Sequence, residues 1–408
     1  MDNKDRIIII GNFLFPSGSA PSMRVRNMAS GFIQNGYEVH IISISPSNNS
    51  TYQVGTMYNE NGYTFEFSSN LNKVNTGAIS KIKYFFKFYL ASKKMFRLFE
   101  RYLKHNNVSI VLGYGRNYMM MNRIFKLCKS FRIPTVLDIC EKYDYSTNIF
   151  NLLNPLKLDQ IVGMKFLPQK ASLLTLITSS LDNYYSRINS NRLIIPGIET
   201  WNVTRPEIKI NSSNKRIITY VGSLIERDNP KLLIDFLYFI SKNKYDITLN
   251  IVGRYRYNKT AQKYLRILES ENSFKNLFKL YDSPSDEDLN KIFVDSDAFL
   301  LTRRNHSEEI YSFPTRLIEF LKTSKPVIVS NIGDIGLYLS NNSNCLMLNE
   351  DTLDEDFRTA IQALYNDEFY MQIGSLGWIA GINKFNSVVE MKKIIKNING
   401  IKEFSLSK

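Results

Sequence analysis

The first 44 residues contain the feature that most limits the fold, which is two apolar runs separated by one helix. Residues 7–15 are mostly apolar and include four consecutive isoleucines. β-branched residues of this kind suit a parallel strand that is covered on both faces. A loop of small residues and a helix over 23–35 follow, Gly36 ends that helix, and residues 38–44 form a second apolar run. This order predicts a βαβ unit of a doubly wound parallel sheet.

The same alternation continues in two sets along the 408 residues, a length typical of two domains. Further strands of the first set are expected at 108–112, 135–139, 173–178 and 192–196. Strands of the second set are expected at 216–221, 247–252, 298–301 and 326–330. The polar segment between the sets has no clear period and is interpreted as a linker. We therefore expect a first Rossmann-like domain over 1–198, a linker over 199–214, a second Rossmann-like domain over 215–375, and a helical segment over 376–408 that can cross back to the first domain.

Cysteine and histidine usage bears on compartment and metal content. The three cysteines are far apart and form no C-x-x-C pair, which favours a reducing compartment over a disulfide framework. The three histidines are too scattered for a three-histidine metal site. No apolar run approaches the ~18 residues that a membrane-spanning helix needs. The residues before the first apolar run carry as many acidic as basic groups, unlike a secretion signal.

The net charge of +14 is concentrated in the first half, where residues 1–200 hold 24 Lys and Arg against 12 Asp and Glu. The segment from Ser80 to His105 carries eight of these cations and one acid, Glu100, among many aromatic residues. A cationic aromatic helix is typical of surfaces that bind anionic lipid headgroups. A helix packed on the sheet with a basic outer face also fits, as does nucleic-acid binding, although no recognised nucleic-acid motif accompanies the charge.

Two motifs follow strands of the second set, where ligands bind in open α/β sheets. In the first, Gly222 ends a strand, Arg227 lies in the loop, and Pro230 opens a helix. A glycine admits a polyanion to the backbone, a helix start offers free N–H groups, and an arginine binds phosphate with two hydrogen bonds. A simple turn explains the glycine equally well.

The second motif begins with two acids, Glu308 and Glu309, and continues as Ser312-Phe-Pro-Thr-Arg-Leu-Ile-Glu319. Pro314 near the helix start, with Ser312 or Thr315 as a cap, again directs N–H groups toward an anion. Glu319 follows about one turn later, where a carboxylate suits ribose hydroxyls. Compensation of the helix dipole is the alternative explanation for this acid.

In this order the parts resemble a retaining glycosyltransferase of family 4, of the type that builds bacterial surface polysaccharides. The resemblance covers nearly the whole chain, and its most specific element is Ser312-Phe-Pro-Thr-Arg-Leu-Ile-Glu-Phe-Leu321, which is similar to the family's S-x-P-[ST]-[KR]-x-x-E-[YF]-[LM] pattern. The opening loop and helix, the strand Gly36-Tyr-Glu-Val-His, and the turn Pro196-Gly-Ile-Glu199 also match. The resemblance implies α/β GT-B architecture, in which two facing Rossmann-like domains with doubly wound parallel sheets enclose a cleft.

The resemblance also implies roles for individual residues. Arg227 meets the donor pyrophosphate, and Glu319 holds the donor ribose as the second Glu of the family's E-x7-E signature. The other residues on the donor side are Gly18, Ser19, Gly222, Ser312, Phe313, Pro314, Thr315 and Arg316. Asp138 and Glu141 are candidates on the acceptor side, where the family often has a histidine.

Besides this missing acceptor-side histidine, the chain departs from the family at two further points. The E-x7-E spacing puts the first Glu at position 311, which is Tyr311, so Glu309 takes that role if two extra residues are accommodated, with Glu308 as the alternative. The family's G-R…K-G pair is reduced to Gly222-Ser223 and Arg227, so one basic residue is absent.

The function implied is transfer of a sugar from a nucleoside diphosphate sugar to a hydroxyl of a lipid-linked glycan, with retention, in capsule, O-antigen or exopolysaccharide synthesis. Catalytic roles fall to Arg227, Glu309 and Glu319. No metal or other cofactor is expected, and the location is cytoplasmic, on the inner face of the membrane, bound there through the segment from Ser80 to His105. Two alternatives are a nucleotide-sugar epimerase of the same fold and a non-catalytic membrane-docking subunit.

Overall fold

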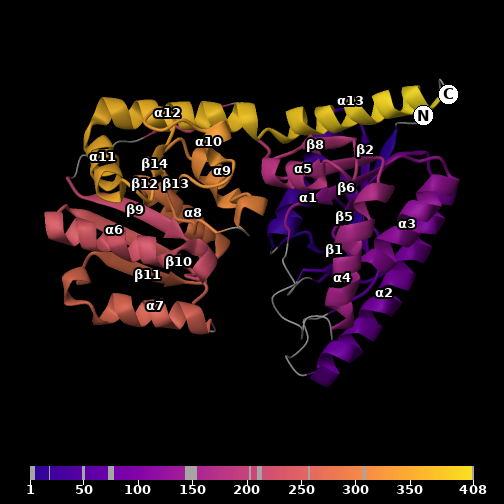
Figure 1. Ribbon diagram of the computed structural model, residues 1–408, viewed down its shortest axis with the longest axis horizontal. Helices are drawn as coiled ribbons and strands as arrows, with labels where there is room; N and C mark the ends of the chain where they lie inside the picture. Colours follow the sequence, from indigo (N-terminus) through magenta and orange to yellow (C-terminus); the bar gives the residue numbers. More distant parts are fainter. Residues whose placement is uncertain are drawn as a thin grey trace. The chain divides into compact units, whose positions relative to one another are not determined.

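The computed structural model describes residues 5–17, 19–47, 51–71, 78–142, 154–201, 204–208, 214–255, 258–306 and 309–406. The chain forms two compact units, each with its own sheet and core (Figure 1). The first unit holds residues 1–200 and 386–408, and the second holds residues 201–385. Two expected site residues, Gly18 and Glu308, lie outside the described residues.

The sheet of the first unit has eight strands in the described residues, in the order β3-β4-β2-β1-β5-β6-β7-β8. All neighbours are parallel except β3 and β4, which are antiparallel. The four isoleucines of β1 are fully buried, as a strand covered on both faces requires. The bounds are β1 Arg6–Phe15, β2 Glu38–Pro46, β3 Tyr58–Glu60, β4 Tyr63–Phe67, β5 Val108–Tyr114, β6 Thr135–Ile139, β7 Leu173–Leu176 and β8 Arg192–Ile194.

The helices of the first unit include the last helix of the chain. Their bounds are α1 Ala20–Gln34, α2 Ala78–His105, α3 Tyr118–Ser130, α4 Pro155–Phe166, α5 Ser179–Tyr185 and α13 Ser387–Leu406. Helix α13 packs against α1 so closely that a Cβ on Gly31 would lie 2.5 Å from the carbonyl oxygen of Ser387. The buried side chains of Met391, Ile394 and Ile398 add α13 to the core of this unit.

The second unit has a six-stranded parallel sheet in the order β11-β10-β9-β12-β13-β14, again within the described residues. Its strands are β9 Arg216–Val221, β10 Ile247–Gly253, β11 Phe278–Asp282, β12 Ala298–Leu301, β13 Val327–Ser330 and β14 Leu346–Leu348. Its helices are α6 Pro230–Asn243, α7 Lys259–Ser270, α8 Asp286–Asp295, α9 Thr315–Lys322, α10 Ile335–Tyr338, α11 Leu353–Tyr365 and α12 Asp367–Lys384.

Helix α12 runs through the expected boundary between residues 375 and 376 and stays in the second unit. Two of its glycines allow close packing, since a Cβ on Gly374 would lie 2.2 Å from the carbonyl oxygen of Ser324 and one on Gly381 would lie 2.2 Å from the Trp201 ring. The chain therefore leaves this unit only after Phe385.

Both sheets confirm the predicted α/β fold class with two parallel-sheet units. In each sheet the strand order reverses once, between β1 and β5 in the first unit and between β9 and β12 in the second. Such a reversal leaves a crevice at the carboxyl ends of the two strands, where ligands of open α/β sheets bind. Among the described helices, none combines the length and the apolar character needed to cross a bilayer.

Candidate active site

The crevice of the second unit brings two separate loops together at the carboxyl ends of β9 and β12. Strand β9 leads through Gly222 into a short 3₁₀ helix, Glu226–Asp228, which carries Arg227. The backbone there is crowded, because a Cβ on Gly253 at the end of β10 would lie 1.9 Å from the carbonyl oxygen of Gly222. The two glycines thus let β9 and β10 end close together beneath the loop.

Asn229 and Asp228 hold the β9–α6 loop in shape. Asn229 adopts a left-handed conformation, with φ of 45°, and its side chain accepts a hydrogen bond from the N–H of Leu232 as the N-cap of α6. The Asp228 carboxylate accepts a hydrogen bond from the Ser223 N–H at 2.8 Å. Burial raises the pKa of Asp228 above its ordinary value, and Arg303 and Arg227 oppose this rise.

The loop after β12 is bonded directly to the loop after β9. The hydroxyl of Thr302 donates to the carbonyl oxygen of Asp228, and the N–H of Arg304 donates to that of Arg227 at 3.2 Å. Asn229 Nδ2 donates to the carbonyl oxygen of Arg303 at 3.3 Å. These bonds place the side chains of Arg303 and Arg227 on the same side of the crevice.

A cluster of two arginines and one buried carboxylate lies in this crevice. Oε2 of Glu309 is 2.9 Å from Arg227 Nε and 3.1 Å from Arg303 Nη1. Arg303 Nη1 also donates to Ser312 Oγ at 3.3 Å. The Glu309 side chain is 8% exposed, against 15% for Arg303 and 35% for Arg227, so the carboxylate is enclosed while one arginine still faces solvent. Burial, and next the charge of Arg227, lower the pKa of Arg303, while Glu309 raises it.

The second motif forms the start of α9 as expected. The expected cap is wrong, because Pro314 is the N-cap residue and no side chain caps the helix: Thr315 is already its first residue, and the Ser312 hydroxyl donates to the carbonyl oxygen of Glu309 instead. The buried face of the helix carries Leu317, Ile318, Phe320 and Leu321. Glu319 is ion-paired with Arg316 and is 18% exposed. Ser312 donates through both its N–H and its hydroxyl to the carbonyl oxygen of Glu309, each at 3.1 Å, which connects the cluster to the helix start.

Two positions of the second motif need separate description: Phe313, a predicted donor-side residue, and Tyr311, which stands where the family has the first Glu. The ring of Phe313 is 5% exposed and packs against Tyr338 and Phe385, so the side chain is part of the core. Tyr311 lies at the end of the 3₁₀ helix Glu309–Tyr311, two positions after the carboxylate that meets the arginines. Glu309, one of the two acids considered for the first Glu of the motif, lies in the cluster, and Glu308 lies outside the described residues.

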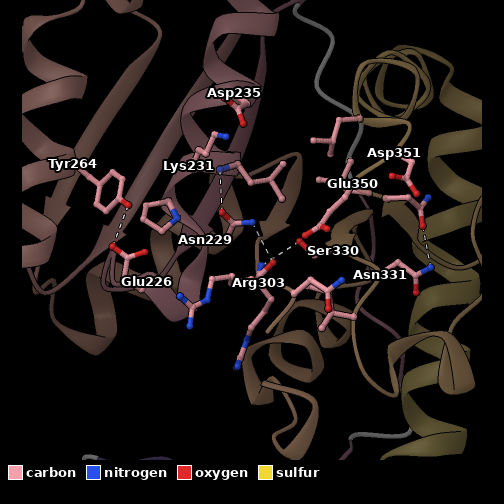
Figure 2. Close-up of a pocket in the computed structure, with 18 residues that line it drawn as sticks. Glu226, Asn229, Lys231, Asp235, Tyr264, Arg303, Ser330, Asn331, Glu350 and Asp351 are labelled. Atoms are coloured by element: carbon pink, nitrogen blue, oxygen red, sulfur yellow. Dashed lines mark hydrogen bonds between the residues drawn. The ribbon is translucent and has the colours of Figure 1, made fainter. Parts of the chain in front are cut away.

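A cavity of about 650 Å³ adjoins the cluster on the α6 side and shares Arg303 with it (Figure 2). It is lined by the α6 start and by the loops after β12, β13 and β14, with Asn229, Lys231, Ser330 and Glu350 among its residues. Basic and acidic side chains both line it. Arg303, which the sequence analysis did not single out, is therefore central to this region, and its position directly after an apolar strand was the available signal.

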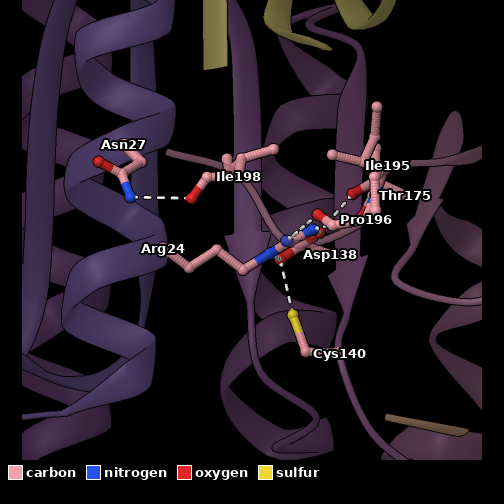
Figure 3. Close-up of polar contacts among 8 residues, drawn as sticks. All are labelled: Arg24, Asn27, Asp138, Cys140, Thr175, Ile195, Pro196 and Ile198. Carbon is pink, nitrogen blue, oxygen red and sulfur yellow. Dashed lines mark hydrogen bonds and ion pairs between the residues drawn. The ribbon is translucent and has the colours of Figure 1, made fainter. Parts of the chain in front are cut away.

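In the first unit, Asp138 forms a buried ion pair with Arg24 (Figure 3). Arg24 Nε and Nη2 donate to the two carboxylate oxygens at 2.8 and 2.9 Å, and Thr175 Oγ1 and Cys140 Sγ also reach the carboxylate. Arg24 donates further to the carbonyl oxygens of Ile195 and Pro196. Burial alone would lower the pKa of Arg24, but Asp138 raises it above the ordinary value.

This network leaves the carboxylate of Asp138 with no exposed surface, so the group holds α1 against β6 and the turn after β8. Glu141, the other acceptor-side candidate, is partly exposed just after β6. Ser19 serves as the N-cap of α1, where its hydroxyl accepts from the Ser22 N–H at 3.2 Å. Arg24 was not singled out from the sequence, because an arginine inside a helix gives no local sign of a buried partner 114 positions away.

Comparison with known proteins finds a family similar to the second unit. Residues 204–375 match the family model described as glycosyl transferases group 1, and this range includes Arg227, Arg303, Glu309 and Glu319. A search of curated proteins by sequence finds no significant match.

Several solved structures are similar over nearly the full length. A sucrose-phosphate synthase from Thermosynechococcus elongatus is 13% identical with a TM-score of 0.69, covering 97% of this chain and 100% of that one. HepE from Anabaena, in complex with UDP, is 12% identical with a TM-score of 0.67, covering 97% and 100%. A glycosyltransferase from Rickettsia africae is 14% identical with a TM-score of 0.65, covering 98% and 99%. These likenesses establish the two-unit GT-B fold. The second unit carries the glycosyl transferases group 1 domain. The chain is therefore a glycosyltransferase of GT-B architecture.

Proposed function

We propose that this enzyme transfers a sugar from a nucleoside diphosphate sugar to a hydroxyl group of a lipid-linked glycan, with retention of anomeric configuration and without a metal ion. The observation that carries the proposal is the buried carboxylate of Glu309 between Arg227 and Arg303, at the carboxyl ends of β9 and β12. Structures of the similar protein HepE contain UDP or UDP-glucose, which supports a nucleotide sugar as donor.

The cluster suits a pyrophosphate because it keeps a net positive charge. Two guanidinium groups share one carboxylate, and the N-terminus of α9 follows in the chain. As the bond to the sugar breaks, negative charge grows on the pyrophosphate, and cations already in place stabilise that charge without rearranging. Arg227 is the more exposed of the two arginines and makes the first contact with phosphate in this proposal.

The two acids of the site have different surroundings and take different roles. Glu309 is held by arginines and accepts a hydrogen bond from a hydroxyl of the donor sugar. Glu319 lies more than a turn into α9, where its carboxylate accepts hydrogen bonds from the ribose. Arg316, now paired with Glu319, turns toward the phosphates when the ribose takes that place.

The acceptor and the biological setting rest on the family resemblance and on the charge distribution. The run from Ser312 to Leu321 is similar to that of family members that build polysaccharides. On this similarity we propose a role in capsule, O-antigen or exopolysaccharide synthesis. A lipid-linked acceptor puts the enzyme on the cytoplasmic face of the cell membrane. The excess of cations in residues 1–200 favours an anionic membrane there over nucleic acid.

A thermal-shift panel of UDP, GDP, ADP and CDP tests donor binding directly. A ligand at 100 times its dissociation constant stabilises the folded protein by ~2.7 kcal/mol. One of the four diphosphates is expected to raise the unfolding temperature, and Arg227→Ala is expected to weaken that effect. If none of the four stabilises the wild-type protein, the proposed donor class is wrong.

A transfer assay then tests the chemistry. With the donor found in the panel, Arg227→Ala and Glu319→Ala are each expected to lower transfer at least about tenfold, or ~1.4 kcal/mol, whereas Arg266→Ala on the exposed side of α7 serves as the unaffected control. A product in which the free nucleotide sugar is isomerised without an acceptor would instead identify an epimerase.

A further inference from the structure

We infer that one face of α2 docks the enzyme on an anionic lipid bilayer by inserting three apolar side chains among cations. The inference rests on the proposed function in one respect, because a lipid-linked acceptor gives the enzyme a reason to bind a membrane. The docking surface itself follows from the exposure and charge of α2 in the fold. Helix α2 has 28 residues, and its side chains are described from Ile82 onward. It lies along the outside of the first unit, beside α3 (Figure 1).

One side of α2 belongs to the core of the first unit. Phe88, Ala91, Met95, Phe99 and Leu103 are each at most 6% exposed. They recur every three or four residues, which places them on one face of the helix. This face explains why α2 is helical and apolar, and it removes these aromatic and aliphatic residues from any binding role.

The opposite side carries an apolar stripe that the fold does not cover. Ile82, Phe86 and Leu90 are 51%, 60% and 58% exposed and are spaced four residues apart, so they lie one above another. Large apolar side chains aligned in this way on a monomer mark an interaction surface. The stripe is confined to the N-terminal half of the described part of α2.

Cations surround the stripe and continue it along the helix. The exposed basic side chains of α2 are Lys83, Lys87, Lys94, Arg97, Arg101 and Lys104. At 100° per residue they fall on the same outward arc as the three apolar residues. Between residues 82 and 105 the single acid is Glu100, and it pairs with Lys104 at 3.2 Å.

Aromatic rings at the borders of this arc are held by cations. Lys93 Nζ lies 4.6 Å from the centre of the Tyr89 ring, and the Arg123 guanidinium of α3 lies 4.7 Å from that of Phe96. An apolar stripe flanked by lysines and arginines is the composition of helices that lie in the headgroup layer, with the apolar face among the acyl chains. The abundance of cations selects anionic headgroups as the partner.

Sedimentation with lipid vesicles tests the inference without donor or acceptor. The intact protein is mixed with vesicles of phosphatidylglycerol and phosphatidylcholine, or of phosphatidylcholine alone. It is expected to bind the first and not the second. Binding is expected to fall as salt rises from about 0.1 M to about 1 M, because the screening length shrinks from ~10 to ~3 Å.

Two variants separate the contributions of charge and insertion. Replacing Lys87, Lys94 and Arg97 by Gln is expected to weaken binding about 100-fold, since each cation near the surface contributes roughly fivefold. Phe86→Ser combined with Leu90→Ser removes the apolar contact. This variant is expected to lose the part of vesicle binding that remains for the wild-type protein at high salt. The matched controls lie in the second unit: Lys242, Lys275 and Lys279 changed to Gln, and Val294→Ser with Leu337→Ser, all at exposed positions.

Equal loss in the control variants, or unchanged binding in both α2 variants, would overturn the inference. So would equally tight binding of the wild-type protein to a single-stranded oligonucleotide, or a dimer that the Phe86 and Leu90 changes dissociate. The α2 variants are expected to keep the thermal shift with the nucleoside diphosphate. If the wild-type protein fails to bind vesicles but keeps the thermal shift with the diphosphate, the docking surface alone is rejected. If the wild-type protein binds vesicles but shows no thermal shift, the donor proposal alone is rejected.

Discussion

Arg303 Nη1 lies 3.1 Å from Oε2 of Glu309, the same oxygen that Arg227 Nε approaches at 2.9 Å. The three residues come from two loops: Arg227 follows β9, and Arg303 and Glu309 both follow β12, up to 82 positions later in the sequence. Removing either guanidinium group would leave the buried carboxylate short of a counter-charge, which costs free energy. The positions of the three side chains therefore depend on one another.

The first prediction concerns Arg303. Arg303→Ala removes one of the two cations expected at the pyrophosphate and leaves Glu309 with Arg227 as its cationic partner in the cluster. We expect kcat/KM for sugar transfer to fall at least tenfold, or ~1.4 kcal/mol. Arg303→Lys restores the charge but not the two-point geometry, and it is expected to recover only part of the loss. Steady-state kinetics at fixed acceptor would measure both, and wild-type rates in the alanine variant would contradict the assignment.

The second prediction distinguishes the cluster from the adjoining cavity. Lys231 lines the cavity but has no place in the cluster. If the donor phosphates lie at Arg227 and Arg303, Lys231→Ala is expected to leave KM for the donor within about twofold, well under the 1.4 kcal/mol of a tenfold change. A tenfold rise in that KM would instead show that the phosphates enter the cavity beside α6.

The third prediction concerns the buried pair Arg24 and Asp138. Asp138→Ala leaves the guanidinium of Arg24 buried without its carboxylate, which is expected to lower the free energy of unfolding by ~3–5 kcal/mol. Urea unfolding followed by circular dichroism would measure the loss. Arg24→Met combined with Asp138→Leu removes both charges and is expected to recover much of the stability. Loss of less than ~1 kcal/mol in Asp138→Ala would mean that water reaches the arginine.

The fourth prediction follows from the raised pKa of Asp228. A carboxyl group with a higher pKa in the folded than in the unfolded state binds protons more readily when folded, so it favours folding at low pH and loses that contribution as pH rises. Asp228→Asn keeps an oxygen that can accept the Ser223 N–H bond but does not ionise. We therefore expect the stability of the variant relative to wild type to be greater at pH 7 than near pH 4. Denaturant titrations at both values test this, and a difference that does not change with pH would contradict it.

Much of the architecture is determined by local sequence patterns. The strand predicted over 7–15 is β1 Arg6–Phe15, and the helix that Pro230 was expected to open is α6 Pro230–Asn243. A strand buried on both faces is a continuous apolar run, and a helix on a sheet has a period of 3.6, so both can be recognised from neighbours in sequence. The strands β3, β4, β11 and β14 were not predicted. β3 and β14 have three residues each, and β11 is only partly buried, so they carry too little pattern.

The sequence alone determined that the chain alternates strands and helices in two sets, that Arg227 and Glu319 follow strands of the second set, and that the basic charge is concentrated near α2. Only the tertiary structure decided which residues meet. Strand β12 pairs with β9 although α6, β10, α7, β11 and α8 lie between them in sequence, and that pairing brings Arg303 and Glu309 to Arg227. The same holds for α2, since only packing shows that Phe88 and Phe99 face the core while Phe86 and Leu90 face solvent. Contacts between distant segments depend on the burial of whole faces, which is a property of the assembled fold and not of any short stretch of residues.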